Sequence, residues 1–256
     1  IYAMKKILMF FLILSFTVSF AQNSAVTQIT YTHNFDFGMP GHKISKLLFT
    51  ATESHYVDGI AIPGEPKEGN AKIIRYEHGK FKEIFSRHIT DNILTTKAKL
   101  HEKFYLATEE LPKINWEIQH GKKATIMGME CTQAKGSFRG RSYTVWFTPE
   151  IPVPFGPWKL GGLPGLILEA SDDLGGATFV ADKIEKLQSI NNFNFGFPDD
   201  PEKFTAVSLR EFITAEDSYH AEVVDAIIAK MPKGSKISNQ KKMPRGGLEL
   251  KYEWEE

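Results

Sequence analysis

The stretch that most constrains this chain runs from Trp146 to Glu169 and reads WFTPEIPVPFGPWKLGGLPGLILE. Five prolines and four glycines lie among its aromatic and aliphatic residues. Proline fixes φ and removes a backbone donor, whereas glycine permits positive φ and close approach of the backbone. Such a segment is either a structural corner or the wall of a binding site. Its composition favours a bend between two strands, with Leu166–Leu168 entering the core.

The N-terminal residues have the composition of an export signal. Lys5 and Lys6 precede an apolar run from Ile7 to Phe20, and Ala21 ends a small-residue cleavage site. The apolar run is short for a membrane span, so we expect a signal peptide over residues 4–21, cleaved after Ala21. A retained signal anchor is the alternative. The absence of cysteine at the junction argues against a lipid anchor, and we expect a periplasmic or secreted protein.

Charge and cysteine content narrow the class of protein. The 31 basic residues balance the 31 acidic ones, and no long charged block occurs, which argues against nucleic acid as a partner. No later segment is long and apolar enough to span a membrane. Cys131 is the only cysteine, so no internal disulfide forms. We expect it to be a buried small apolar side chain rather than a reactive thiol.

Short alternating runs bounded by turn residues predict strand after strand from Thr27 to about Ile184. A hairpin loop is predicted over 171–176. The expected fold is mainly β (α+β), a large curved antiparallel sheet or open barrel with a C-terminal helix. Residues 22–190 are expected to form this β-rich domain, with 191–256 packed on it.

The last quarter of the chain differs in pattern. A polar and aromatic linker is predicted over 191–201, and Ser208 with Glu211 forms a capping box for a helix ending near Met231. The tail, Leu248 to Trp254, is expected to be a short strand or an arm lying on the body. The helix carries one apolar stripe. It consists of Leu209, Phe212, Ile213, Val223, Val224, Ile227 and Met231, and we expect His220, on or near it, to be a core histidine.

No familiar catalytic pattern is present. The eight histidines show no metal-ligand spacing, and no Gly-x-Ser-x-Gly elbow occurs. The glycines at 161–165 precede a strand-like run rather than a helix, so they do not make a phosphate loop. Asp172 and Asp173 are more consistent with capping a turn than with acid–base chemistry. We therefore expect no cofactor and no metal.

Arg139 and Arg141 are the best candidates for binding an anion. They lie two residues apart, which predicts one face of a strand, where guanidinium groups could pair with an anionic ligand or cap the sheet edge. Nearby aromatic residues could line an apolar pocket or form one end of the core. The candidate ligand-binding residues are Arg139, Arg141, Tyr143, Trp146, Phe155 and Trp158.

The hexapeptide Gly162-Leu163-Pro164-Gly165-Leu166-Ile167 resembles the motif that names the GLPGLI family. The surroundings also resemble that family's pattern, through Trp116, Gly128, Cys131, Ala134, the run Phe138–Arg141, Tyr143, the run Trp146–Pro152, Gly156 and Pro157. The resemblance implies a secreted or periplasmic Bacteroidota protein of uncharacterised function, often encoded near TonB-dependent outer-membrane receptors. It supplies no catalytic residues. A weaker similarity is to the open barrel of periplasmic lipoprotein carriers.

Two functions from different classes follow. The first is a non-enzymatic exported module whose concave side binds a lipid, another apolar ligand, or an envelope partner such as a TonB-dependent receptor system. The alternative is a metal-dependent or hydrolytic enzyme that uses dispersed His, Asp and Glu residues. An envelope scaffold without a ligand is a third possibility.

Overall fold

The computed structural model describes residues 26–38, 40–59, 62–63, 82–188, 201–231 and 245–255. The predicted signal peptide and residues 191–200 of the predicted linker lie outside these ranges. Within the described residues, no helix is both long and apolar enough to span a membrane.

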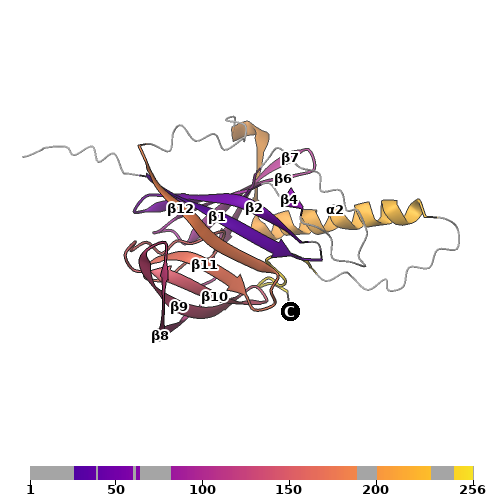
Figure 1. The fold of residues 1–256 in the computed structure, drawn as a ribbon. Coiled ribbons are helices and arrows are strands. Elements are labelled where there is room, and N and C mark those ends of the chain that lie inside the picture. The colour runs from indigo at the N-terminus through magenta and orange to yellow at the C-terminus, as the bar shows by residue number, and fades with distance from the viewer. Residues whose placement is uncertain are drawn as a thin grey trace, which may run out of the picture.

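The described chain is a large β-sheet with one long helix (Figure 1). The elements are β1 (Val26–Asp36), β2 (Pro40–Phe49), β3 (Glu53–Val57), β4 (Ile62–Pro63), β5 (Ile84–His88), β6 (Ile93–Leu100), β7 (Lys103–Glu110), β8 (Glu117–Ile126), β9 (Met129–Phe138), β10 (Arg141–Thr148), β11 (Leu166–Asp172), β12 (Ala177–Leu187), η1 (Pro201–Lys203), β13 (Phe204–Ser208) and α2 (Leu209–Ala229). The strand order is β13-β7-β6-β5-β3-β2-β1-β12-β11-β10-β9-β8, and β4 pairs with β2. Because the path ends at two different edge strands, the sheet is open. The predicted mainly-β class is confirmed.

The sheet bends most where β11 meets β12. Residues 169–171 pair with 178–180 there, a much shorter ladder than the one that joins β12 to β1. Figure 1 shows β8–β11 turned away from β12, β1 and β2 at this point. The curved sheet therefore has two halves, β8–β11 and β1–β7 with β12, that enclose a common interior.

One strand pair departs from the predicted antiparallel arrangement. Strand β13 lies parallel to β7, with Phe204 opposite Phe104 and Ser208 opposite Thr108. The other ladders are antiparallel, mostly joined by short turns that force the chain to reverse. Strand β13 reaches the edge through a long connection from β12, so no tight turn imposes its direction.

The turn between β9 and β10 corrects one prediction. Arg139 and Gly140 form a two-residue turn with φ of 46° and 83°, the backbone of a type I′ hairpin. Met127 and Gly128 do the same between β8 and β9, with φ of 53° and 80°. The prediction that Arg139 shares a strand face with Arg141 is therefore wrong. Pattern analysis missed the turn because its first position usually carries Asn, Asp or Gly.

The hairpin predicted over 171–176 is confirmed, and β11 and β12 flank it. The Asp172 carboxylate accepts a hydrogen bond from the Leu174 amide at 2.8 Å. The Asp173 carboxylate accepts one from the Thr144 hydroxyl at 3.3 Å. The Asp172 carboxylate thus caps the turn, as predicted, whereas the Asp173 carboxylate bonds to a side chain of β10.

Helix α2 begins as predicted. The Ser208 hydroxyl accepts a hydrogen bond from the Glu211 amide, and the Glu211 carboxylate accepts one from the Ser208 amide, which completes the capping box. Leu209, Phe212 and Ile213 are buried against the sheet. The first turns of the predicted apolar stripe are therefore core.

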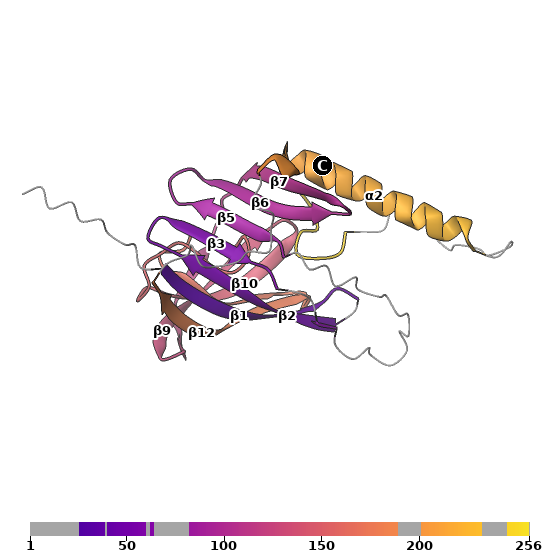
Figure 2. The same ribbon diagram turned by 90° about the horizontal axis from the view of Figure 1, so that it is seen from above.

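The second half of α2 extends past the edge of the sheet (Figure 2). The same stripe continues there but is exposed, from 39% at Val223 to 56% at Ile227. His220 is also exposed, so its prediction as a core histidine is wrong. The helical period was correct, but the sheet ends before the helix does.

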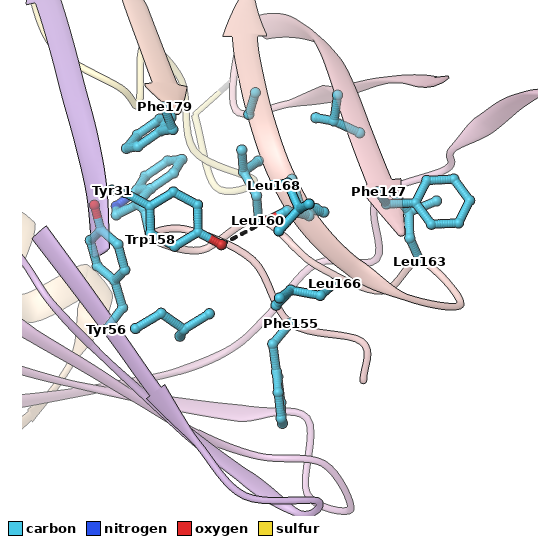
Figure 3. Packing of buried hydrophobic residues seen from close by; sticks show 14 of the residues in the cluster. Tyr31, Tyr56, Phe147, Phe155, Trp158, Leu160, Leu163, Leu166, Leu168 and Phe179 are labelled. Atoms are coloured by element: carbon cyan, nitrogen blue, oxygen red, sulfur yellow. Dashed lines mark hydrogen bonds between the residues drawn. The ribbon is translucent and has the colours of Figure 1, made fainter. Parts of the chain in front are cut away.

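The segment between β10 and β11, residues 149–165, enters the interior of the curved sheet, and we call it the inner loop. Phe155, Trp158, Leu160 and Leu163 of this loop are at most 8% exposed. Figure 3 shows them in one cluster with Tyr31 and Tyr56 of one half and Phe147 and Leu168 of the other. The inner loop thus fills the space that the two halves enclose.

Candidate functional site

Hydrogen bonds hold the inner loop to both halves of the sheet. The Arg87 guanidinium on β5 donates to the Pro154 carbonyl at 3.1 Å and lies over the Phe155 ring. The Trp116 indole donates to the Gly161 carbonyl at 2.8 Å. The bend predicted from the prolines and glycines is therefore a packed, cross-linked part of the core.

The GLPGLI hexapeptide lies at the exit of the inner loop. Gly162 has φ of 88°, a conformation that favours glycine. Leu163, Leu166 and Ile167 are at most 2% exposed and belong to the main hydrophobic core. In this structure the hexapeptide turns the chain and begins β11.

Arg139 lies in a buried cluster of charges beside the inner loop. Its side chain is 1% exposed and forms ion pairs with Glu109 at 2.5 Å, with Glu253 at 3.0 Å and with Glu249. Glu109 lies near the end of β7, whereas Glu249 and Glu253 belong to the C-terminal residues 245–255. The turn that carries Arg139 thus joins β7 to the C-terminal residues.

Lys159 is the second buried cation, and sequence analysis missed it. Its ammonium group lies 2.7 Å from Glu109 and 2.9 Å from Glu249, and its side chain is 2% exposed. The signal available in the sequence was a single lysine inside an otherwise apolar, proline-rich segment. The inner loop therefore contributes both apolar residues to the core and a charge to this cluster.

Residues 245–255 lie across the cluster as an irregular arm, which we call the C-terminal arm. The Leu250 amide donates to the Arg139 carbonyl at 2.9 Å. The Arg141 guanidinium donates to the Gly247 carbonyl at 2.8 Å, and the Tyr143 hydroxyl donates to the Leu248 carbonyl at 3.4 Å. Of the two forms predicted for the tail, it takes that of an arm.

Mutual pairing stabilises the charged forms in the cluster. Burial alone would raise the pKa of Glu249, but Lys159 and Arg139 outweigh it and lower this pKa below the ordinary value. For Arg139, burial opposes the charge, and Glu249, Glu253 and Glu109 together raise its pKa. Each buried charge depends on its partners, because a buried ion without a partner is costly.

Arg141 has separate partners. Its guanidinium lies 3.2 Å from the Asp172 carboxylate, which is fully buried, and covers the Phe37 ring at 5.0 Å. The two arginines thus converge on the C-terminal arm from different elements, Arg139 from the turn and Arg141 from β10. Tyr143 joins them through its hydroxyl.

The predicted aromatic residues belong to the core. Phe155 and Trp158 are 1% and 8% exposed, and the Trp158 ring contacts Phe138 edge-on at 5.6 Å. Trp146 is half-buried and packs against the same core. The structure thus brings Arg139, Arg141 and Tyr143 to the C-terminal arm and places Trp146, Phe155 and Trp158 in the core packing. An external ligand for these residues stays a prediction.

Among the described residues, no group of three or more His, Cys, Asp or Glu side chains is arranged to hold a metal ion. Cys131 is fully buried on β9, and burial raises the pKa of its thiol to about 11. Its predicted burial in a strand is confirmed, and its lack of reactivity stays a prediction.

Two kinds of comparison relate this chain to known proteins. The family model described as "N-glycanase peptide, N-terminal domain" matches residues 71–210, which is 140 of the 256 residues. Among curated proteins, no sequence gives a significant match.

Two solved structures share the fold of this chain. Two structures of PNGF-II, in space groups C2 and P21, each superpose with a TM-score of 0.52 at 17% identity over 75% of this chain. An uncharacterised conserved protein from Thermus thermophilus gives a TM-score of 0.38 at 10% identity, over 73% of this chain and 93% of that one. This chain spans about a third of PNGF-II, 32% and 33% in the two structures. By the family match over more than half its length, the chain belongs to the N-glycanase peptide, N-terminal domain family.

Proposed function

We propose that this chain is a non-enzymatic, exported module that binds a polypeptide partner in the cell envelope. One observation favours a polypeptide over a lipid as the ligand. The interior of the curved sheet, where an apolar ligand would be expected, is filled by Phe155, Trp158, Leu160 and Leu163 of the inner loop. Interiors packed to this extent leave little room for an acyl chain.

The exposed half of α2 supports a protein partner. Val223, Val224, Ile227 and Met231 continue the face that packs on the sheet, and each is at least 39% exposed. Contiguous exposed apolar residues of this kind are typical of protein interaction sites. In PNGF-II the matched region is a third of a longer chain, so a domain like this one lies there beside further polypeptide. We therefore propose a folded protein domain as the occupant.

Export rests on the predicted signal peptide and on the GLPGLI resemblance. The resemblance also favours a site of action near TonB-dependent receptors. Both remain part of the proposal.

The test is to purify the protein from its native envelope and identify what remains bound. The Val224→Asp/Ile227→Asp variant disrupts the exposed face. The matched control, Ala229→Asp, places the same charge on the opposite face of the same helix. The proposal expects one protein bound in stoichiometric amounts by wild type and by the control, and lost from the double variant. Stoichiometric lipid in place of protein, or equal binding by all three, would contradict it.

The hydrolytic alternative has its own direct test, because the family's description names an N-glycanase. The purified chain is incubated with a denatured N-glycosylated protein, and released glycan is measured. The proposal expects no release above buffer. Turnover that scales with the amount of this chain and survives further purification would overturn the non-enzymatic assignment.

A further inference from the structure

We propose that the residues beneath the C-terminal arm, Arg139, Arg141, Tyr143 and Lys159, which we call the groove, form a peptide-binding site for an acidic segment of a partner protein. The C-terminal arm occupies this groove within the chain. The proposal deepens the polypeptide-binding function proposed above, and rests on it, by naming the chemistry of a ligand. The groove binds the arm through ion pairs and backbone hydrogen bonds, the contacts by which receptors bind peptides.

Without the arm, the two buried cations of the groove lack most of their carboxylate partners. Arg139 and Lys159 are almost fully buried, and apart from the arm they form ion pairs with one carboxylate, that of Glu109, among the described residues. The arm supplies the other two, from Glu249 and Glu253. An unpaired buried cation is strongly unfavourable, so the groove selects a ligand that brings carboxylates.

The groove also binds the backbone of the arm. The Arg139 carbonyl accepts hydrogen bonds from the amides of Leu250 and Lys251, at 2.9 and 3.3 Å. The Arg141 guanidinium donates to the Gly247 carbonyl through both Nε and Nη2, at 2.8 and 2.5 Å. Backbone bonds do not depend on the side chains of the arm, so a different peptide can form the same ones.

The shape of the groove fits this backbone closely. A Cβ at Gly140 would lie 3.0 Å from the Leu250 side chain, so the glycine leaves space for the arm. The Tyr252 ring lies under the Arg139 guanidinium at 4.8 Å and stacks on Trp254 at 4.7 Å. The preferred ligand is therefore an acidic segment with carboxylates four residues apart and an aromatic residue between them.

A competing peptide can displace the arm from the groove. Residues 245–255 form no strand or helix, so their departure breaks no ladder of the sheet. The arm gives up its ion pairs, its backbone hydrogen bonds and the packing of Tyr252 and Leu248. An incoming acidic peptide with an aromatic residue restores the ion pairs, the backbone bonds and the aromatic packing, while the arm keeps the entropic advantage of belonging to the same chain.

The probe is a fluorescein-labelled peptide with the sequence of residues 245–256, RGGLELKYEWEE, added to the full chain. Binding is followed by fluorescence polarisation. In Glu249→Gln/Glu253→Gln the arm loses the two carboxylates that pair with the groove, while the groove keeps its own charges. We expect this variant to bind the peptide at least tenfold more tightly than wild type. The control Lys251→Gln changes an exposed residue of the arm, and it should bind as wild type does.

A second peptide, with Gln at both positions of the acidic pair, tests the chemistry. It should bind the double variant at least tenfold more weakly than the acidic peptide. Equal binding of the two peptides, or no binding of the acidic peptide to the double variant, would overturn the proposal. Adding Arg139→Gln to the double variant should abolish the gain.

If a variant does not fold, hydrogen–deuterium exchange on the wild-type protein tests the same site. Excess acidic peptide should speed exchange of the arm amides of Leu250 and Lys251 and leave the β10 and β11 amides unchanged. Unchanged exchange of the arm at saturating peptide would again overturn the site. Failure here, with an envelope partner still bound through α2, would refute the groove and leave the proposed function standing.

Discussion

Gly165 lies so close to Thr148 that a Cβ on residue 165 would be 2.2 Å from the Thr148 carbonyl oxygen. The glycine of the hexapeptide with positive φ is Gly162, not Gly165. Gly165 is therefore required because two backbone segments meet at the end of the inner loop. The need is for space, and no rotation of a neighbouring side chain can supply it.

The first prediction concerns this contact. Gly165→Ala should lower the free energy of unfolding by about 3 kcal/mol or more, because the backbone at the start of β11 must shift. Gly121→Ala is the control, since a Cβ there meets nothing within 4 Å. Urea unfolding followed by tryptophan fluorescence measures both. A Gly165→Ala protein as stable as the control would show that the two segments can separate at little cost.

The second prediction compares two buried tyrosines. The Tyr31 hydroxyl donates to the Ile167 carbonyl at 2.6 Å, whereas the Tyr143 hydroxyl lies 3.4 Å from its acceptor. Tyr31→Phe leaves a buried carbonyl without this donor and should cost about 1–3 kcal/mol. Tyr143→Phe should cost less, because the longer bond is weaker. The expected order of unfolding midpoints is wild type, Tyr143→Phe, then Tyr31→Phe, and the reverse order would contradict the assignment.

The third prediction concerns acid stability and His33. Its imidazole is 2% exposed, stacks on Phe179, and has no hydrogen-bond partner at either nitrogen among the described residues. Burial lowers the pKa of His33 to about 4; Asp58 raises this pKa and Lys43 lowers it, each by less than burial does. The ordinary pKa of histidine is about 6.5, so between the two pKa values His33 is protonated in the unfolded chain and neutral in the folded protein.

The contribution of neutral His33 to the free energy of unfolding is therefore fully present above pH 6.5 and is lost as the pH falls toward 4. The loss is about 3 kcal/mol, from the difference between the two pKa values. His33→Phe should remove this part of the pH dependence, whereas His120→Gln, at an exposed position, should not. Denaturant unfolding at about pH 4, 5, 6 and 7.5 measures the difference. Parallel curves for wild type and His33→Phe would show that His33 titrates normally.

The fourth prediction concerns the thiol of Cys131. Burial raises its pKa to about 11, and the side chain is inaccessible in the folded protein. Thiolate is the reactive form, so labelling by a disulfide reagent at about pH 8 should be at least a hundredfold slower than in denaturant. The expected stoichiometry on unfolding is one thiol per chain, because the sequence has one cysteine. Rapid labelling of the folded protein would indicate that β9 opens readily.

Local patterns predicted the parts of the fold whose causes are local. Alternation marked the strands, turn residues marked the 171–176 hairpin, and Ser208 with Glu211 marked the start of α2. Each of these depends on residues a few positions apart, within reach of pattern analysis. The same limit explains the error at Arg139, where Gly140 and strand pairing impose a positive φ that arginine rarely adopts.

The candidate site depended on contacts over much longer separations. Arg139 pairs with Glu249, 110 residues away, and Lys159 with Glu249, 90 residues away. No spacing in the sequence indicates which of its many acidic residues reaches a given cation. His220 shows the opposite error, since its helical position was correct but the sheet stops short of it.

The β-rich class, the capped helix and the bend at Trp146–Glu169 thus follow from the amino-acid sequence, because backbone preferences and short-range periodicity act before any packing. Tertiary structure alone decided that this bend turns inward to fill the sheet, and that the two candidate arginines meet the chain's own C-terminal arm. The difference arises because burial brings distant parts of the chain into contact. A charge or an aromatic ring acquires its role from what surrounds it, and those surroundings come from parts of the chain that are distant in sequence.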